Sequence, residues 1–519
     1  MDKKRVIIIG GGAAGLTAAY RILEASNQYV PIIIEADDKV GGLAKTVFDE
    51  YGNGTDIGPH RFFSKNNEVI NFWKKIFPFQ NAPSVDDILL KREMCLSETG
   101  EDPQKTDNVF LIRKRFSRIY YKKHFIDYPI KLRLSTISAI RLLKTFSAGM
   151  SYICSVFRKL PEANLESFMI NRFGKVLYRL FFEGYTQKVW GVHPSAISKD
   201  WGVQRIKGIS LLGILYNAIL SPFNLIKKKE TSLIEEYYYP KMGSSSLWEA
   251  MADKIRQNGG VILLNTRVNQ IVKNNNKIVS VNVTNDKTGK TEEISADIFI
   301  SSMPVKDLLT NMNDVSDEIY NIADKLCYRD YILANYVVSN INLKNNTKWP
   351  TINNIAPDSW IYLQDNGIHA GRLDIMNNFS PYIISDFKNN FVINMEYFCN
   401  ENDEFWNKDD CYIKEFGLEE LKNLNILDND NVKSSRIIRI KKAYPSYFGS
   451  YDSFYKIKDY INSIENLYCI GRNGQHKYNN MDHSILSGMV VSRIITQNHD
   501  KNILWDINTE SDYQETKSL

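Results

Sequence analysis

The sequence predicts an α/β fold, because its first part alternates strand, glycine turn, helix and strand. Val6–Ile9 is a continuous apolar run, typical of a strand that is buried on both faces of a parallel sheet. Gly10–Gly15 follows at once and holds four glycines, and apolar residues then recur at helical spacing from Leu16 to Leu23. A second apolar run, Ile32–Ile34, completes a strand, helix, strand unit of the kind that builds parallel sheets.

The glycine turn has the residue spacing of a dinucleotide-binding fingerprint. Gly10 permits the tight turn, Gly12 lets the backbone approach a pyrophosphate, and Gly15 lets the helix touch the strand. The first turn of the helix, around Ala14, would then face the phosphates. Glu35 ends the second strand about twenty residues after Gly15, where an acidic residue binds ribose hydroxyls. These five residues predict a nucleotide cofactor in a Rossmann-like domain.

Three later segments resemble flavin-contacting parts of the large FAD oxidoreductase superfamily. Lys39–Thr46 continues the first loop with two glycines, Gly259–Val268 is similar to a strand that reaches the adenine, and Ala296–Pro304 is similar to a further sheet strand with its turn. The resemblance implies FAD as the cofactor. It adds three cofactor contacts: Gly42, Leu43 and Val268.

The domain organisation follows from the positions of these segments. They lie at the start and in the middle of the 519 residues, and a further one lies near the end, so the FAD-binding domain is expected to be discontinuous. We therefore expect a Rossmann-like FAD-binding domain with a mainly helical insertion and an antiparallel-sheet substrate domain. The expected ranges are 1–75, 240–310 and 455–497 for the FAD-binding domain, 76–239 for the insertion, 311–454 for the substrate domain and 498–519 for a tail.

Composition excludes several classes of protein. Hydrophobic residues make up 43% and charged residues 24% of the chain, which is typical of a globular protein. The formal net charge of +5 is too small to indicate a nucleic-acid partner. Six cysteines are scattered without a C-x-x-C pair, so neither a disulfide framework nor a metal site is expected. The N-terminus leads directly into the first strand, which predicts a cytoplasmic location. Nothing in the composition argues against a homo-oligomer.

One long apolar segment has no place in the cofactor pattern. Residues 208–226 carry no charge and lie between Lys207 and the run Lys227–Lys229. The segment contains Asn217, Pro222 and Asn224, which argue against a transmembrane span. Two interpretations stay open: an element that packs on the protein, and a lid or peripheral contact with a membrane.

The stretch Ile470–Ser484 is expected to be a strand-to-helix turn, because an apolar run precedes it and an apolar-periodic helix follows. Arg472 supplies a cation, Tyr478 a phenol, and a helix begins near Asp482. Together these groups could hold an anionic ligand and an electron-rich ring. The alternative is a basic surface turn that Asp482 caps.

The middle of the chain resembles the UDP-galactopyranose mutases motif by motif. Asp56–Phe63 looks like their Gly-x-His loop, in which the histidine lies against the flavin. Glu183–Pro194 is very similar to the bacterial segment Gly-Tyr-Thr-x-Lys-x-Trp-Gly, and Trp201–Ile206 follows where these enzymes carry an active-site arginine. Tyr237–Gly243 resembles the Pro-Lys-x-Gly segment that leads back into the FAD-binding domain.

Two later matches favour the mutases over other relatives. The spacing from Trp360-Ile361-Tyr362 to Arg372 reproduces that of a substrate-holding tyrosine and arginine in eukaryotic mutases. Gly471–Ser484 resembles the same enzymes, although Gln475–Tyr478 departs from their aromatic-rich version. In most amine-oxidase relatives an acidic residue stands at the position of Arg472, whereas an arginine there prefers a diphosphate ligand.

The resemblance implies a flavin-dependent pyranose/furanose mutase of nucleotide-diphosphate sugars, which acts in cell-surface polysaccharide biosynthesis. In such enzymes N5 of reduced FAD forms a covalent adduct with the sugar, so the flavin must only stay reduced, with NAD(P)H as the expected external reductant. The implied catalytic residues are His60, Arg205, Arg372 and Arg472. The implied substrate-binding residues are Tyr185, Trp190, Trp360, Tyr362, Tyr447, Tyr478 and Asn480. The C-terminal stretch adds the cofactor contacts Gly471, Arg472, Met481, Asp482 and Ser484.

Ordinary structural roles remain open for several of these residues. His60 could be a structural histidine in a turn, Arg205 a solvated charge on a helix, and Tyr362 or Tyr447 an aromatic residue packed in a sheet. A second function also remains open: an FAD-dependent oxidoreductase, similar to amine or protoporphyrinogen oxidases, that transfers hydride from a sugar or a lipid-linked intermediate. It would use the same cofactor segments but gives less reason for three arginines at mutase positions.

Overall fold

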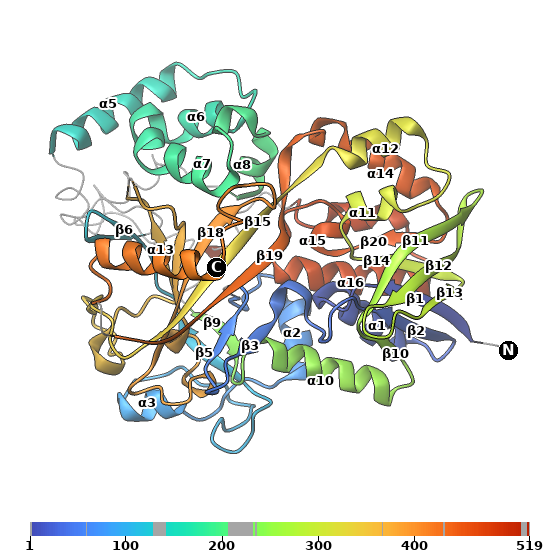
Figure 1. The fold of residues 1–519 in the computed structure, drawn as a ribbon, viewed down its shortest axis with the longest axis horizontal. Coiled ribbons are helices and arrows are strands. Elements are labelled where there is room, and N and C mark those ends of the chain that lie inside the picture. The colour runs from blue at the N-terminus through green and yellow to red at the C-terminus, as the bar shows by residue number, and fades with distance from the viewer. Residues whose placement is uncertain are drawn as a thin grey trace.

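The computed structural model describes residues 3–58, 60–127, 142–205, 232–233, 236–365, 367–428, 431–509 and 516–517. The expected α/β architecture is confirmed: a parallel sheet with helices stands beside a long, mainly antiparallel sheet, and a group of helices covers one end (Figure 1). The apolar segment 208–226 lies outside the described residues. Within them, no helix combines the length and the apolar character that a membrane crossing requires.

The nucleotide-binding side is built on a five-stranded parallel sheet. Its strand order is β10 (Val261–Leu263), β2 (Tyr29–Ile34), β1 (Lys4–Ile9), β14 (Ile298–Ser301) and β20 (Leu467–Cys469). The last four residues of β1 are all isoleucine or valine and are buried, which explains why this strand lies at the centre. The chain leaves β1 towards β2 on one side, while β14 pairs on the other, so the carboxyl end of β1 is a topological switch point.

Helices α1 (Ala13–Ala25) and α16 (Met481–Gln497) cross above this sheet with very little space between them. A Cβ atom on Gly488 would lie 2.5 Å from the Ala14 carbonyl oxygen and 2.8 Å from the Thr17 Cβ atom. A Cβ atom on Gly15 would lie 2.0 Å from the Gly10 carbonyl oxygen. Gly488 therefore lets the C-terminal helix approach α1, and Gly15 lets α1 approach the end of β1. Helix α10 (Ser244–Gln257) packs on the other side of α1.

A second, smaller part of this side is a three-stranded antiparallel sheet with short helices. The strands are β11 (Thr266–Asn274), β12 (Lys277–Asn285) and β13 (Thr291–Ser295). The helices are α11 (Val305–Thr310), α12 (Asp317–Asp324) and α14 (Phe454–Ser463). Val268 of β11 is buried in the apolar cluster that joins this sheet to β1 and β14.

The other large sheet has seven strands. Its order is β19 (Val432–Gly449), β15 (Leu326–Val338), β18 (Phe391–Cys399), β17 (Arg372–Ile375), β16 (Trp360–Leu363), β6 (Ser117–Tyr121) and β7 (His124–Asp127). All neighbours are antiparallel except β16 and β6, which are parallel. Most of β15 is buried on both faces, because helix α13 (Asp410–Asn423) covers one face and the nucleotide-binding side covers the other.

Residues 76–239 contribute strands as well as helices. The helices are α5 (Leu142–Phe157), α6 (Leu165–Tyr178), α7 (Gly184–Trp190) and α8 (Lys199–Arg205), and they form one group at the upper left of Figure 1. Before them, α2 (Asn67–Ile76) and α3 (Val85–Leu89) lead to β5 (Phe110–Lys114), which pairs with β9 (Glu236–Pro240). Strands β6 and β7 extend the seven-stranded sheet. The pairing partners of such short strands lie far along the chain, so the local sequence pattern does not show that these segments are strands.

The first part of the tail is also packed. Residues Lys501–Asp506 form a 3-10 helix, and Leu504 and Ile507 are buried in the apolar cluster around α1 and α16. These two apolar side chains give the segment beyond α16 a fixed place on the nucleotide-binding side.

The crossing of α1 and α16 yields a prediction about stability. Gly488→Ala should destabilise the protein by about 1–3 kcal/mol, because the added methyl group meets backbone atoms that cannot move independently. Gly149→Ala is the matched control: a Cβ atom at Gly149 meets nothing within 4 Å, so the change should be neutral or stabilise α5 by up to about 1 kcal/mol. Guanidinium unfolding of both variants measures the difference. Equal stability of the two variants would contradict the tight crossing.

Candidate active site

A cradle of glycines lies at the carboxyl end of β1. Gly10 has φ 101°, and a Cβ atom there would lie 2.3 Å from the Ser302 Oγ atom. The backbone of Gly12 runs beside Gly42, so a Cβ atom on Gly12 would lie only 3.7 Å from the Gly42 Cα atom, and the Gly41 N–H donates to the Gly11 carbonyl at 2.9 Å. Two glycine loops from separate parts of the chain thus leave a surface without side chains in front of the first turn of α1.

Glu35 fixes the shape of this cradle. Its Oε2 atom accepts a hydrogen bond from the Gly11 N–H at 2.6 Å, and its Oε1 atom accepts one from the Asp37 N–H at 2.9 Å. Burial raises the pKa of the Glu35 carboxyl above its ordinary value, although the two backbone N–H groups act in the opposite direction. The carboxylate is therefore held at the end of β2, directly beside the fingerprint turn.

The C-terminal stretch closes the cradle from the other side. Gly471 has φ 74°, and a Cβ atom there would lie 3.1 Å from the Ala14 Cβ atom. The Gly471 N–H donates to the Ser487 Oγ atom at 2.9 Å, and α16 begins at Met481 after a capping box formed by Asn480 and His483. The predicted contacts of the glycine loops, Glu35 and Gly471 thus lie around one place, and Ser484 lies on the first turn of α16.

An open cavity of about 150 Å³ lies between this cradle and the seven-stranded sheet. Ten predicted residues line it: Leu43, His60, Trp360, Tyr362, Arg372, Arg472, Tyr478, Asn480, Met481 and Asp482. Seven further residues line it that were not among the predicted site residues: Gly58, Arg61, Phe63, Trp73, Tyr331, Ala443 and Tyr444. The walls are therefore aromatic, with three arginines among them.

Arg472 is held by backbone carbonyls and aromatic rings. Its Nε atom donates to the Asn479 carbonyl at 2.8 Å, and its Nη1 atom donates to the Ala443 carbonyl at 3.0 Å. The guanidinium lies 5.2 Å from the ring centroids of both Tyr444 and Tyr478. No carboxylate in the described part of the chain forms an ion pair with it. The cavity wall thus carries one half-buried positive charge that the protein positions but does not neutralise.

Arg372 is held differently, because a carboxylate neutralises it. Its Nε atom donates to the Glu396 Oε2 atom at 2.6 Å, and its Nη2 atom donates to the Tyr444 hydroxyl at 3.0 Å. A second carboxyl group, Asp374, is fully buried next to Glu396. Burial, and then the charge of Glu396, raise the pKa of Asp374 well above its ordinary value, so this carboxyl group holds its proton. The group of Arg372, Glu396 and Asp374 is therefore close to electrically neutral.

Arg61 was not predicted, and it is the third arginine of the cavity. Its guanidinium stacks on the Trp360 ring at 3.4 Å from the centroid and donates to the Ser117 Oγ atom at 2.6 Å and to the Phe116 carbonyl at 2.7 Å. It follows directly after His60, so its position next to a predicted site residue is the one signal that could have identified it.

His60 lies on the cavity wall with a buried carboxylate behind it. The His60 Nδ1 atom is 3.4 Å from the Asp56 Oδ2 atom. Asp56 also accepts a hydrogen bond from the Ser244 hydroxyl at 3.1 Å and one from the Thr46 hydroxyl at 2.5 Å. The Nδ1 atom has no hydrogen-bond partner in the described part of the chain, so the carboxylate lies beside the imidazole ring without a hydrogen bond to it.

Some predicted site residues lie behind the wall. Tyr185 packs edge-on against Tyr362 with centroids 5.8 Å apart, and Trp190 packs against Tyr478 at 6.2 Å. Tyr447 is buried, and its hydroxyl accepts a hydrogen bond from the Tyr478 N–H at 2.7 Å. These residues support the tyrosines that line the cavity and do not line it themselves.

Two other predicted residues are placed less directly. Arg205 is the last residue of α8, and its side chain lies outside the described part of the structure. Val268 is buried in the apolar cluster of the three-stranded sheet, at 8% exposure.

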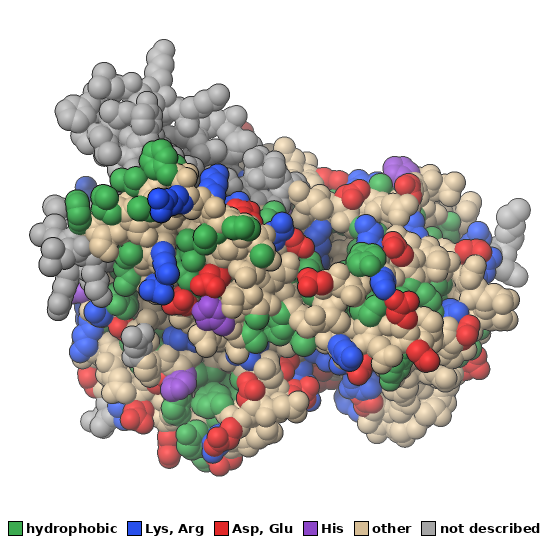
Figure 2. Space-filling model, turned by 90° about the horizontal axis from the view of Figure 1, so that it is seen from above, with side chains coloured by type: hydrophobic (Ala, Val, Ile, Leu, Met, Phe, Trp, Pro, Cys, Tyr) green, Lys and Arg blue, Asp and Glu red, His purple; other side chains and the backbone are tan. Residues whose placement is uncertain are grey.

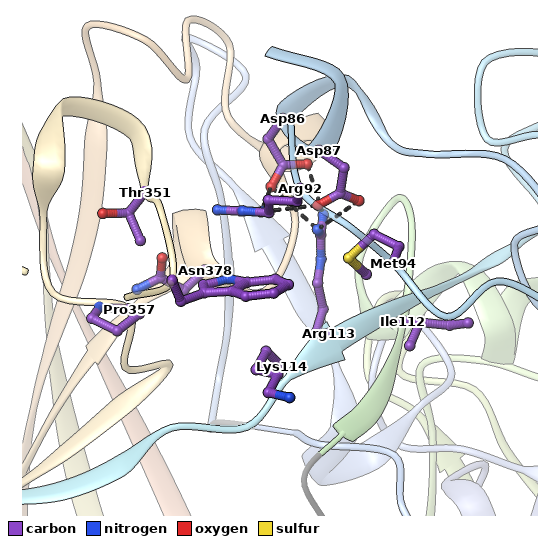
Figure 3. A pocket seen from close by; sticks show the side chains of 11 residues that line it. Asp86, Asp87, Arg92, Met94, Ile112, Arg113, Lys114, Thr351, Pro357 and Asn378 are labelled. Carbon is purple, nitrogen blue, oxygen red and sulfur yellow. Dashed lines mark hydrogen bonds and ion pairs between the residues drawn. The ribbon is translucent and has the colours of Figure 1, made fainter. Parts of the chain in front are cut away.

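Two charged groups outside this cavity have structural explanations. In a smaller cavity, Asp86 and Asp87 turn towards Arg92 and Arg113 (Figure 3). Burial alone would raise the pKa of Asp86, but the two arginines outweigh it and lower that pKa. The Arg113 Nε atom also donates to the Phe379 carbonyl at 2.9 Å, so this cluster fastens β5 to the loop after β17.

A histidine and two glutamates also lie close together, although the sequence has no metal-ligand spacing. Potential ligand atoms of Glu166, Glu183 and His193 lie within 4.8 Å of one another. The Ser195 N–H donates to the His193 Nδ1 atom at 3.3 Å, which leaves the proton of the neutral ring on Nε2, at 3.5 Å from Glu183. A polar contact between the Nε2–H group of His193 and the Glu183 carboxylate accounts for this arrangement.

The fold and this site define a dinucleotide-binding protein whose cofactor cradle opens into an aromatic cavity with arginines. Residues 13–324 match the family model described as flavin containing amine oxidoreductase, which is more than half of the chain. The chain belongs to this family, whose members bind a flavin.

Curated relatives include L-amino-acid oxidases. The L-amino-acid oxidase BjussuLAAO-I of Bothrops jararacussu is 24% identical over 286 residues, 52% of this chain and 48% of that protein. The L-amino-acid oxidase of Crotalus adamanteus is 31% identical over 136 residues, 25% of this chain and 22% of that protein. The chain thus spans about half the length, or less, of the curated relatives it matches.

Solved structures match over nearly the whole chain. A crystal structure of reduced UDP-galactopyranose mutase superposes with a TM-score of 0.75 at 19% identity, covering 99% of this chain and 100% of that one. Cyclohexylamine oxidase from Brevibacterium oxydans IH-35A superposes with a TM-score of 0.58 at 11% identity, covering 96% and 99%. These likenesses confirm the predicted fold and the resemblance to the mutases within the amine-oxidase superfamily.

The residues at the cradle fit a flavin dinucleotide. The positions where a pyrophosphate must touch the backbone are glycines at which a Cβ atom would clash or fill the gap, and Gly12 caps α1 without a side chain. Glu35 stands at the end of β2, where proteins with this fingerprint bind a ribose. The cavity with Arg472 and the N-terminus of α16 begins directly beside this cradle.

The two carboxyl groups beside Arg372 should respond differently to substitution. Asp374→Asn should change stability by less than about 1 kcal/mol at neutral pH, because it replaces a carboxyl group that already carries its proton. Glu396→Gln should cost about 3 kcal/mol or more, because it leaves Arg372 buried without its partner. Guanidinium unfolding tests both.

The pH dependence supplies a further check of the same pair. In the unfolded chain Asp374 releases its proton near its ordinary pKa of 3.8, whereas in the folded protein it keeps the proton to a higher pH. Its contribution to stability is therefore lost as the pH rises from 3.8 through the pKa of the folded state. Asp374→Asn should flatten that part of the stability profile. An unchanged profile, or a large loss of stability in Asp374→Asn at neutral pH, would contradict the assignment of the proton.

Proposed function

We propose that this chain is an FAD-dependent mutase that interconverts the pyranose and furanose forms of a nucleotide-diphosphate sugar. The observation that carries this proposal is the guanidinium of Arg472. It stands at the edge of the flavin cradle, beside the stacked rings of Tyr444 and Tyr478, and two carbonyl groups hold it there. A positive charge kept in place without a protein counter-ion fits a ligand that brings its own negative charge.

The other groups of the cavity fit the same ligand. The Tyr362, Tyr444 and Tyr478 hydroxyl groups are donors for phosphate oxygens, and burial raises the pKa of Tyr444 to about 12, so its hydroxyl stays protonated. Arg372 adds a second guanidinium, although Glu396 already neutralises its charge. Trp360 and Phe63 offer flat apolar surfaces for a sugar ring or a base.

The chemistry needs an electron-rich nucleophile and a stabilised leaving group. When bound in its reduced form, FAD would supply the nucleophile for the anomeric carbon without net oxidation, and NAD(P)H is the reductant we propose. The chain's own contribution is to bind the diphosphate as it departs. An arginine at about 4 Å from a phosphate charge contributes roughly 4 kcal/mol at an effective dielectric constant near 20. This attraction acts on the negative charge that develops on the diphosphate as it departs, so it lowers the free-energy barrier to its departure.

His60 and the first turn of α16 act on the flavin side. His60 lines the cavity beside the Asp56 carboxylate, so its ring can hydrogen-bond towards the cavity. The N-terminus of α16 carries the partial positive charge of a helix dipole beside Asn480 and Met481, which favours an anionic ring system. Asp482 accepts a hydrogen bond from the Ser64 hydroxyl at 3.0 Å, which fixes this turn.

An oxidoreductase is the second candidate. Family membership and the matched L-amino-acid oxidases support it, because those relatives are oxidases. In that case Arg372 or Arg472 would bind the acidic group of a substrate, and hydride would leave the substrate for the flavin. The two functions differ in whether electrons move between substrate and flavin overall.

Arg472 should dominate nucleotide binding. Arg472→Ala should weaken binding of UDP to the FAD-loaded protein by roughly ten- to a hundredfold, because hydrogen bonds to charged groups contribute about 1.5–3 kcal/mol each. Arg493→Ala is the control: this arginine lies on α16 but pairs with Glu68 at 2.9 Å, away from the cavity, and should leave affinity unchanged. Titration calorimetry with UDP, dTDP and GDP measures both. Equal affinities of Arg472→Ala and Arg493→Ala would remove the main support for the proposal.

The reaction itself separates the two candidates. The dithionite-reduced protein should convert nucleotide-diphosphate sugars between ring forms, seen as a new peak of unchanged mass in chromatography, and the oxidised protein should be inactive. Bleaching of the oxidised flavin by an amine or a sugar substrate without added reductant, together with no ring conversion across UDP, dTDP and GDP sugars, would favour the oxidoreductase instead.

A further inference from the structure

Helix α5 exposes large apolar side chains along its length. Phe146 is 72% exposed, Met150 49%, Ile153 49% and Phe157 83%. These four residues are spaced by four, three and four positions, so they lie on one side of the helix, which we name the α5 face. Leu160, just beyond the helix, is exposed as well.

The α5 face is not the side by which the helix is attached. Ala148, Tyr152 and Ser155 are buried, and α5 packs against α6 through that opposite side. No residue from Thr145 to Phe157 is charged. A surface helix of an ordinary globular protein carries polar residues on its outer side, so an apolar outer side indicates a surface that binds something.

The chain around α5 is cationic. Residues 128–161 contain six lysines and arginines and no acidic residue, and residues 201–229 contain five more and again no acidic residue. The whole chain has 65 Lys and Arg against 60 Asp and Glu, so the remainder of the chain is net negative. Arg158 and Lys159 stand at the end of α5, and the next acidic residue, Glu162, pairs with Arg172 at 2.6 Å. Positive charge is therefore concentrated in the sequence that flanks this helix and α8.

We propose that the α5 face docks on an anionic lipid surface. A helix that lies in the interface buries its apolar side among the lipids, while nearby lysines and arginines are attracted to anionic headgroups, each by about 1 kcal/mol. Two copies of this chain that met through the α5 face would bring Arg158 and Lys159 of each copy close together, which disfavours self-association through it. The combination of an apolar face with cationic, acid-free flanks therefore fits a membrane surface better than a second copy.

The proposal is independent of the reaction in the cavity. None of the described residues of α5 lines that cavity. Figure 2 views the molecule from above, and hydrophobic side chains gather at the left, with Lys, Arg, Asp and Glu among them, on the side where Figure 1 places α5. Docking through this side would leave the nucleotide-binding part, at the right of both views, away from the lipid.

Vesicle sedimentation of the full-length, FAD-loaded protein tests the proposal. It should bind phosphatidylcholine vesicles that contain phosphatidylglycerol, bind pure phosphatidylcholine weakly, and lose binding as salt is raised. Phe146→Asp and Phe157→Asp should each lower the partition coefficient at least about tenfold, equivalent to about 1.4 kcal/mol. Tyr455→Asp is the control, because Tyr455 is 59% exposed on α14, and it should bind as the unsubstituted protein does.

The substituted side chains are exposed, so flavin content and melting temperature should not change. Failure to bind anionic vesicles would overturn the proposal, and so would equal binding by the Phe157→Asp and Tyr455→Asp variants. Sedimentation velocity supplies the other decisive outcome: a dimer that Phe157→Asp dissociates, without lipid binding by either form, would assign the α5 face to a second copy and overturn the lipid assignment.

Discussion

The structure depends on the close approach of backbones in front of α1. Gly12 lies against Gly42 from the next loop, and Gly15 lies against the Gly10 carbonyl. Gly471 and Gly488, from the far end of the chain, both lie against Ala14 of α1. Side chains at these positions would separate the two ends. Their absence lets residues more than 450 positions apart form one cradle, and this contact sets Arg472 and the start of α16 at the cavity edge.

Electrostatic balance then distinguishes the arginines of the cavity. Arg372 is paired with Glu396 and lies beside the protonated Asp374, so it supplies geometry and hydrogen bonds more than net charge. Arg472 has carbonyl and aromatic neighbours, which orient a guanidinium but leave its charge in place. Arg472 therefore places a positive charge on the side of the flavin cradle, where a departing diphosphate would need it, and the Asp482 carboxylate lines the same cavity.

The sequence predicted the features that depend on local pattern or on recognisable motifs. The fingerprint turn, Glu35 and the C-terminal stretch could be identified because glycines and charges at fixed spacing have few structural alternatives. The sequence did not predict which distant strands pair: β6 and β7 join a sheet whose other strands come some two hundred residues later or more. For the same reason Glu396 and Asp374 were missed, and Trp190 and Tyr447 were expected at the cavity, although they lie behind Tyr478.

The most direct measurement is a crystal structure of the reduced, FAD-loaded protein with UDP. Our account predicts the diphosphate in the cavity, with its oxygens at hydrogen-bond distance, about 2.7–3.2 Å, from the guanidinium of Arg472 and with Arg372 and the tyrosines around it. A diphosphate bound elsewhere, or Arg472 in contact only with the flavin, would contradict the account.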